Sequence, residues 1–87
     1  MKDVLIYSSS LCPYCYRAKA LLNSKNVPYK EINVDMNPTA RAEMRSKASG
    51  RNTVPQIFIG GEHIGGCDDL YSLESQGDLT PMLAIAS

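Results

Sequence analysis

The sequence of 87 residues contains no tryptophan, one phenylalanine and one histidine. It also has no excess of charge, because nine basic and nine acidic residues cancel. Such a balance provides no electrostatic surface for nucleic acid or for an anionic membrane, so we expect neither as a partner. Hydrophobic residues make up 44% of the chain, which is ordinary for a globular protein and argues against disorder.

Long hydrophobic runs are absent as well. The first apolar run, residues 4–7, is too short for the core of a signal peptide and far too short to span a bilayer. Neither end carries a lipidation signal. Three cysteines are an odd number, which fits poorly with the closed disulfide framework of a secreted protein. We therefore expect a cytoplasmic protein.

Linkers, internal repeats and low-complexity tracts are also missing, so residues 1–87 are predicted to form a single small domain. The first part of the chain alternates between strand and helix patterns. Residues 4–7 are typical of a strand covered on both faces, and residues 13–25 have helical spacing. Residues 29–34 alternate with period two, which predicts a second strand with one partly exposed face.

The second half of the chain predicts a helix, a hairpin and another helix. The first of these helices runs to about Ser49 and has Asn37 as its N-cap. Gly60-Gly61 separates two short strand patterns, as in a β-hairpin. The following helix begins with Cys67 or Asp68 as its cap, and a short helical turn comes after it. The order β-α-β-α-β-β-α predicts an α/β fold with a mixed four-stranded sheet flanked by three main helices.

Two cysteines separated by two residues stand where the first strand pattern gives way to the first helix. Pro13 suits the first helical position, which places Cys12 at the positive end of the helix dipole. That position favours the thiolate, which is the nucleophilic form of cysteine. Cys15 lies about one turn further in and should be more buried. The alternative is half of a zinc site, but no second Cys-x-x-Cys and no paired histidines follow.

Two further motifs lie far along the chain. Thr53-Val54-Pro55 precedes the hairpin and, taken alone, is simply the entry into a strand. Gly65-Gly66-Cys67-Asp68-Asp69 follows the hairpin and combines close backbone approach with a helix N-terminus. Such an end can bind a carboxylate, or it can be a plain cap provided by Asp68.

The three motifs together, in this order, resemble those of the dithiol glutaredoxins, in particular the small bacterial members, over essentially the whole chain. The resemblance implies the thioredoxin-like fold and a glutathione-dependent thiol–disulfide oxidoreductase. In that reaction Cys12 attacks and Cys15 resolves, with glutathione as co-substrate, no tightly bound cofactor and no metal. The implied partners are glutathionylated or disulfide-containing proteins, ribonucleotide reductase among them. We expect the protein to act as a monomer.

The resemblance also assigns glutathione binding to eight residues: Tyr14, Thr53, Val54, Pro55, Gly66, Cys67, Asp68 and Asp69. It implies a cis bond before Pro55, which lets the backbone of Val54 pair with the cysteinyl part of glutathione. The N–H groups of Cys67 and Asp68 would hold the glutamyl carboxylate, and the Asp69 side chain its ammonium. Tyr14 would cover the sulfur.

Asn52 stands where some family members have a basic residue, but the departure from the family pattern that matters more is at Ser9. Many glutaredoxins have a lysine three residues before the first cysteine, where this chain has Ser9. Arg51 is the first candidate to replace that charge, ahead of Arg17 and Lys19.

Two rival functions stay open at this point. A thioredoxin-like carrier would be reduced by a flavin reductase, but the Trp-Cys-Gly-Pro-Cys loop of thioredoxins needs a tryptophan that this chain lacks. The other rival binds an iron–sulfur cluster through Cys12 and glutathione. Family members of that kind usually have a Cys-Gly-Phe-Ser loop, and Pro13 and Cys15 argue against it.

Overall fold

The computed structural model describes residues 2–84. The segment Val4–Ser8 is one of the two central strands of its sheet. The elements in chain order are β1 (Val4–Ser8), α1 (Pro13–Ser24), β2 (Lys30–Asn33), α2 (Pro38–Lys47), β3 (Gln56–Ile59), β4 (Glu62–Gly65), α3 (Cys67–Ser75) and α4 (Leu79–Ala84). The strand order is β2-β1-β3-β4. β1 runs parallel to β2 and antiparallel to β3, and β3 and β4 form the hairpin. The predicted mixed sheet and element order are confirmed, and α4 is the short final turn.

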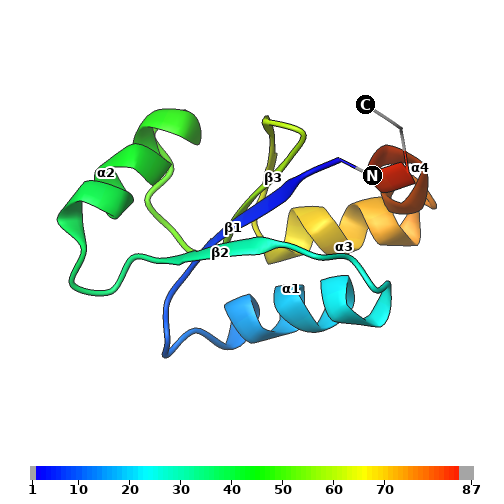
Figure 1. Cartoon of the computed structure of the whole chain (residues 1–87), viewed down its shortest axis with the longest axis horizontal. Coiled ribbons are helices and arrows are strands. Elements are labelled where there is room, and N and C mark those ends of the chain that lie inside the picture. Colours follow the sequence, from blue (N-terminus) through cyan, green and yellow to red (C-terminus); the bar gives the residue numbers. More distant parts are fainter. Residues whose placement is uncertain (1, 85–87) are drawn as a thin grey trace.

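The two faces of the sheet build two separate cores. α1 and α3 lie side by side on one face, whereas α2 lies on the other face near one end (Figure 1). Ile6 of β1, Leu22 of α1 and Leu70 of α3 belong to the larger core and are fully buried. Tyr7 and Met44 belong to the smaller core beneath α2. Neighbouring residues of β1 therefore contribute to opposite cores, as the alternation of a strand requires.

The helix starts show how side chains define the ends of the elements. Asn37 caps α2 as predicted, because its side-chain oxygen accepts the N–H of Ala40 at 3.1 Å. The prediction for α3 is wrong by one or two positions, since its N-cap is Gly66 and not Cys67 or Asp68. The Asp69 carboxylate reaches back and accepts the N–H of Gly66 at 2.9 Å. This bond, rather than an Asp68 cap, fixes where the helix begins.

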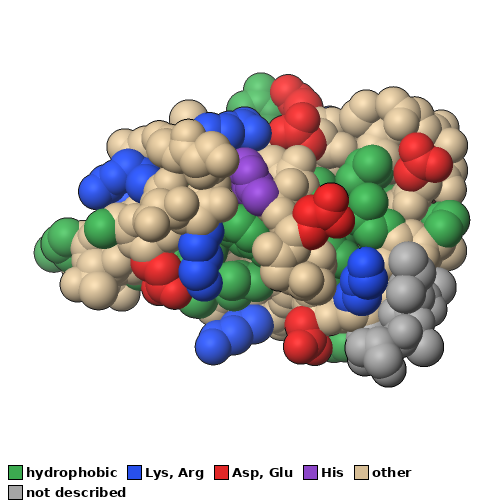
Figure 2. Space-filling model, turned by 90° about the horizontal axis from the view of Figure 1, so that it is seen from above, with side chains coloured by type: hydrophobic (Ala, Val, Ile, Leu, Met, Phe, Trp, Pro, Cys, Tyr) green, Lys and Arg blue, Asp and Glu red, His purple; other side chains and the backbone are tan. Residues whose placement is uncertain are grey.

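Charged side chains of both signs are interspersed on the face seen from above (Figure 2), in keeping with the balanced composition. Strand β2 lies at one edge of the sheet, and three of its four residues are exposed. Within residues 2–84, no helix has the length and apolar character needed to cross a membrane.

Candidate active site

Cys12 is the N-cap of α1, as the position of Pro13 predicted. Its sulfur accepts the backbone N–H of Cys15 at 3.0 Å, and its thiol lies 3.7 Å from the carbonyl oxygen of Val54. An N–H group that points at the sulfur and the positive end of the helix dipole thus place partial positive charge beside Cys12. The side chain is recessed, with 8% of the residue exposed.

Cys15 is fully buried one turn further into α1. Burial, followed by the hydrogen bond with Cys12, raises the pKa of Cys15 to about 12. Cys15 is therefore a neutral thiol at pH 7, while Cys12 is the sulfur nearer to solvent. Both thiols are free, so the structure represents the reduced dithiol.

The antiparallel pairing of β1 with β3 brings the loop before β3 beside the cysteines. Tyr7, near the end of β1, is opposite Gln56 at the start of β3. The Val54–Pro55 peptide bond is cis, as the family resemblance implied. The carbonyl oxygen of Val54 lies 3.7 Å from the Cys12 thiol although the two residues are 42 positions apart.

A buried amide holds this loop in place. The side chain of Gln56 is fully buried and donates to the carbonyl oxygen of Thr53 at 3.0 Å. Its oxygen lies 2.7 Å from Nε2 of His63 on the neighbouring strand. The single histidine of the chain thus supports the loop from behind, at a distance from the thiols, as a structural residue.

The start of α3 forms the opposite wall of the site. Asp69 not only caps the helix but also lies 3.4 Å from Arg51 through the same carboxylate oxygen. Gly65, just before the helix, has a φ of +121°, and a Cβ there would overlap that oxygen. The chain can therefore turn into α3 only because residue 65 has no side chain.

A groove of about 330 Å³ lies between these walls. Its lining contains all eight residues that the sequence predicted for glutathione, together with Arg51: Tyr14, Arg51, Thr53, Val54, Pro55, Gly66, Cys67, Asp68 and Asp69. A volume of roughly 300–1,000 Å³ is typical of small-molecule sites. The groove offers backbone groups, a guanidinium and two carboxylates, which suits a short zwitterionic peptide.

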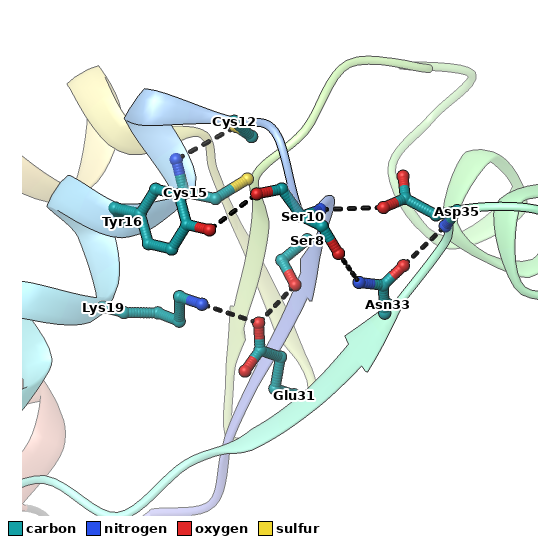
Figure 3. A network of polar contacts seen from close by, with 9 residues as sticks. All are labelled: Ser8, Ser10, Cys12, Cys15, Tyr16, Lys19, Glu31, Asn33 and Asp35. Carbon is teal, nitrogen blue, oxygen red and sulfur yellow. Dashed lines mark hydrogen bonds and ion pairs between the residues drawn. The ribbon is translucent and has the colours of Figure 1, made fainter.

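Ser9 has a different role from the lysine found at its position in many relatives. Its hydroxyl donates to Asp35 at 2.6 Å. The N–H of Ser10 donates to the other carboxylate oxygen of Asp35 at 2.8 Å, as Figure 3 shows. These bonds hold the pKa of the Asp35 carboxyl below its usual range. Ser9 does not line the groove. Among the residues that do, the cation is Arg51.

Cys67 is the third thiol, and it lies in the wall of the groove as the first residue of α3. It is 5% exposed, and burial is the main cause that raises the pKa of its thiol. The thiol is therefore shielded by packing.

A larger hollow of about 820 Å³ lies elsewhere, bordered by β1, β2 and Lys47 of α2. None of the cysteines lines it, whereas the smaller groove is lined by Cys67 and by Val54, whose carbonyl oxygen contacts the Cys12 thiol. In the part of the chain that the structure describes, no three side chains of histidine, cysteine or acidic residues gather as a metal site.

Comparison with known proteins places the chain in a family. The family model described as Glutaredoxin matches residues 4–64. The chain is similar to Glutaredoxin 3 of Escherichia coli (strain K12), with 58% identity over 95% of this chain and 99% of that protein. It is similar in structure to glutaredoxin from Brucella melitensis, with a TM-score of 0.83 and 57% identity over 95% of this chain and 89% of that one.

A crystal structure of the buckwheat glutaredoxin–glutathione complex is also similar, with a TM-score of 0.86 and 36% identity over 98% of this chain and 83% of that one. These likenesses confirm the predicted thioredoxin-like fold. Glutaredoxins use glutathione as a substrate and need no tightly bound cofactor. The chain therefore belongs to the glutaredoxin family of glutathione-dependent thiol–disulfide oxidoreductases, with its Cys-x-x-Cys site at Cys12 and Cys15.

Proposed function

We propose that Cys12 is the nucleophile, Cys15 the resolving thiol and the groove the glutathione site. The difference between the two sulfurs supports the first assignments. Cys12 is the more accessible and accepts an N–H group, whereas Cys15 is fully buried with a raised pKa. A thiolate nucleophile needs access to a substrate sulfur, and a resolving thiol needs only to reach its neighbour.

The reaction with glutathionylated proteins requires Cys12 alone. The Cys12 thiolate attacks the glutathione sulfur of the mixed disulfide, and the protein thiolate leaves and takes up a proton. A second glutathione thiolate then attacks that sulfur, releases Cys12 and forms oxidised glutathione. The net reaction converts one mixed disulfide and one glutathione into one protein thiol and one oxidised glutathione.

Protein disulfides require both thiols. Cys12 forms a mixed disulfide with the substrate, and Cys15 then attacks Cys12 and expels the substrate as a thiol. The resulting Cys12–Cys15 disulfide is reduced by two glutathione molecules. Disulfide-containing and glutathionylated proteins are thus the proposed partners, with ribonucleotide reductase proposed from the family resemblance alone. We propose that a monomer does this work in the reducing cytoplasm.

The observation that carries this proposal is the groove beside Cys12, because it gathers backbone and charged groups from distant segments. Val54 offers its backbone beside Pro55, in a position to pair with the cysteinyl part of glutathione. Cys67 and Asp68, at the start of α3, line the groove, and a helix N-terminus can bind a carboxylate through its N–H groups. Asp69 retains one carboxylate oxygen outside its bonds to Gly66 and Arg51, available for the glutamyl ammonium.

The function is tested by NADPH loss in an assay that couples a small glutathione mixed disulfide to glutathione and glutathione reductase. We expect Cys15→Ser to retain turnover of this substrate and to lose most reduction of a peptide disulfide, because only the latter needs a second thiol. Equal loss of both activities would contradict the role of Cys15. An absence of turnover in the parent protein, with activity restored by thioredoxin reductase, would contradict the dependence on glutathione.

The charge of Arg51 should contribute to glutathione affinity, since it is the cation that lines the groove. Arg51→Gln removes the charge and keeps a polar side chain, and we expect the KM for the mixed disulfide to rise about three- to tenfold with little change in kcat. The effect should shrink at high salt because both charges are partly exposed. Arg41→Gln is a suitable control, because Arg41 instead contacts Asn52. An unchanged KM would show that Arg51 does not contact the substrate.

A further inference from the structure

An ion pair joins α1 to the edge strand close to the cysteines. Nζ of Lys19 lies 2.9 Å from Oε2 of Glu31, and the hydroxyl of Ser8 donates to the same oxygen (Figure 3). Ser8 is fully buried, and 18% of the Lys19 side chain is exposed. The two hydrogen bonds lower the pKa of Glu31, and Glu31 raises the pKa of Lys19. Both partners are therefore charged at pH 7.

Cys15 shares the helix face of Lys19. The two residues are four positions apart on α1, a spacing that places side chains on one face about one turn apart. In Figure 3 the side chains of Lys19 and Ser8 meet at the carboxylate of Glu31, below the side chain of Cys15. The ammonium of Lys19 acts on the Cys15 thiol and lowers its pKa, against the larger effect of burial.

We propose that Lys19 supplies the positive charge that stabilises the Cys15 thiolate in the resolving step, and that Glu31 is the positioning residue that holds it. This inference rests on the proposed function, because it assumes that Cys15 resolves. It goes beyond that function by naming the groups that make a buried thiol reactive.

The step creates charge where burial opposes it. Cys15 loses its proton to solvent and attacks Cys12 of the mixed disulfide. The Cys12–Cys15 bond forms, the bond between Cys12 and glutathione breaks, and glutathione leaves as a thiolate that takes up a proton. A negative charge therefore appears briefly on a fully buried sulfur. A cation beside a buried sulfur stabilises such a charge more than it would in bulk water.

Few other groups can take this role among the described residues. The Cys12 thiol and the backbone N–H of Ser9 face Cys15, and only the N–H favours its thiolate. Around Lys19 lie the rings of Tyr16 and Tyr29, which carry no positive charge.

The test is a single-turnover measurement on the intact protein, in which the Cys12–glutathione mixed disulfide is formed first and release of glutathione is followed by stopped flow between pH 6 and pH 10. We expect Lys19→Met to slow release at pH 7 about three- to tenfold and to move the pH profile upward. Lys19→Arg should restore the rate. Glu31→Gln keeps a side-chain oxygen that can accept from Lys19 and Ser8 and removes only the opposing charge, so it should release glutathione at least as fast as the parent.

The chain offers a matched control at the other end of α1. Lys25 and Glu74 form a pair of the same length, 2.9 Å, with the same 18% exposure of the lysine side chain. Lys25→Met should leave both rate and pH profile unchanged. A parent-like profile in Lys19→Met would overturn the inference, as would an equal slowing in Lys19→Met and Glu31→Gln, which would indicate a purely structural pair. If Cys15→Ser released glutathione as fast as the parent, the resolving role itself would fail.

Discussion

Replacing Cys12 with serine should lower turnover of a glutathione mixed disulfide by at least about a thousandfold, because a hydroxyl is not ionised near neutral pH and cannot take the place of a thiolate. The loss should extend to peptide disulfides, since both reactions begin with Cys12. The NADPH-coupled assay measures the first activity, and release of thiols from a peptide disulfide measures the second.

The Cys12→Ser variant should remain folded, which makes the result easy to interpret. Cys12 is the N-cap of α1 and accepts the N–H of Cys15. Serine is among the residues most favoured at that position, so the helix start retains its hydrogen bond. Circular dichroism and the thermal midpoint should match the parent. Turnover within tenfold of the parent would show that another group is the nucleophile.

Replacing Gly65 with alanine should destabilise the fold by about 2–4 kcal/mol and weaken glutathione binding together with it. Two causes add at this position. A φ of +121° is strained for any residue with a side chain, and the new Cβ would overlap the Asp69 carboxylate. Asp69 must then move, which breaks its bond to Gly66 and disturbs the groove. Urea unfolding measures the first effect, and calorimetric titration with glutathione measures the second.

Gly77→Ala separates the two causes. Gly77 also has a positive φ, of +77°, but a Cβ there would meet nothing within 4 Å. We expect this variant to cost about 1 kcal/mol and to bind glutathione like the parent, because it bears only the backbone strain. Equal losses of stability and of binding in the two variants would mean that the contact with Asp69 has no special importance.

Much of the fold could be predicted because local signals agreed with the final packing. The Pro13 helix start, the Asn37 cap and the Gly60-Gly61 turn each act within a few residues, and each lies where it was predicted. The groove lining was also foreseen, since three motifs of one known family occurred in order. How those residues bind a ligand stays a prediction that the experiments above address.

The features that escaped sequence reasoning depend on contacts between distant residues. The cap of α3 was misplaced because the Asp69 side chain, three positions into the helix, reaches back to Gly66. The pattern Gly-x-x-Asp was the available signal, but an acidic residue nearer the start looked equally suitable. The Ser8–Glu31 bond spans 23 positions, and no local pattern marks it. Arg51 was only one of several candidate cations until the fold brought it into the groove.

The antiparallel pairing of β1 and β3 gives the molecule a working end and a remote end. Tyr7 and Gln56 share the end that carries the thiols, while Val4 and Ile59 share the other, where the hairpin turns at Gly60. Side chains near that turn lie at the opposite end of the sheet from the thiols. Glu62, which is exposed there, is consequently a suitable anchor for a fluorophore or a surface tether that reports on turnover without taking part in it.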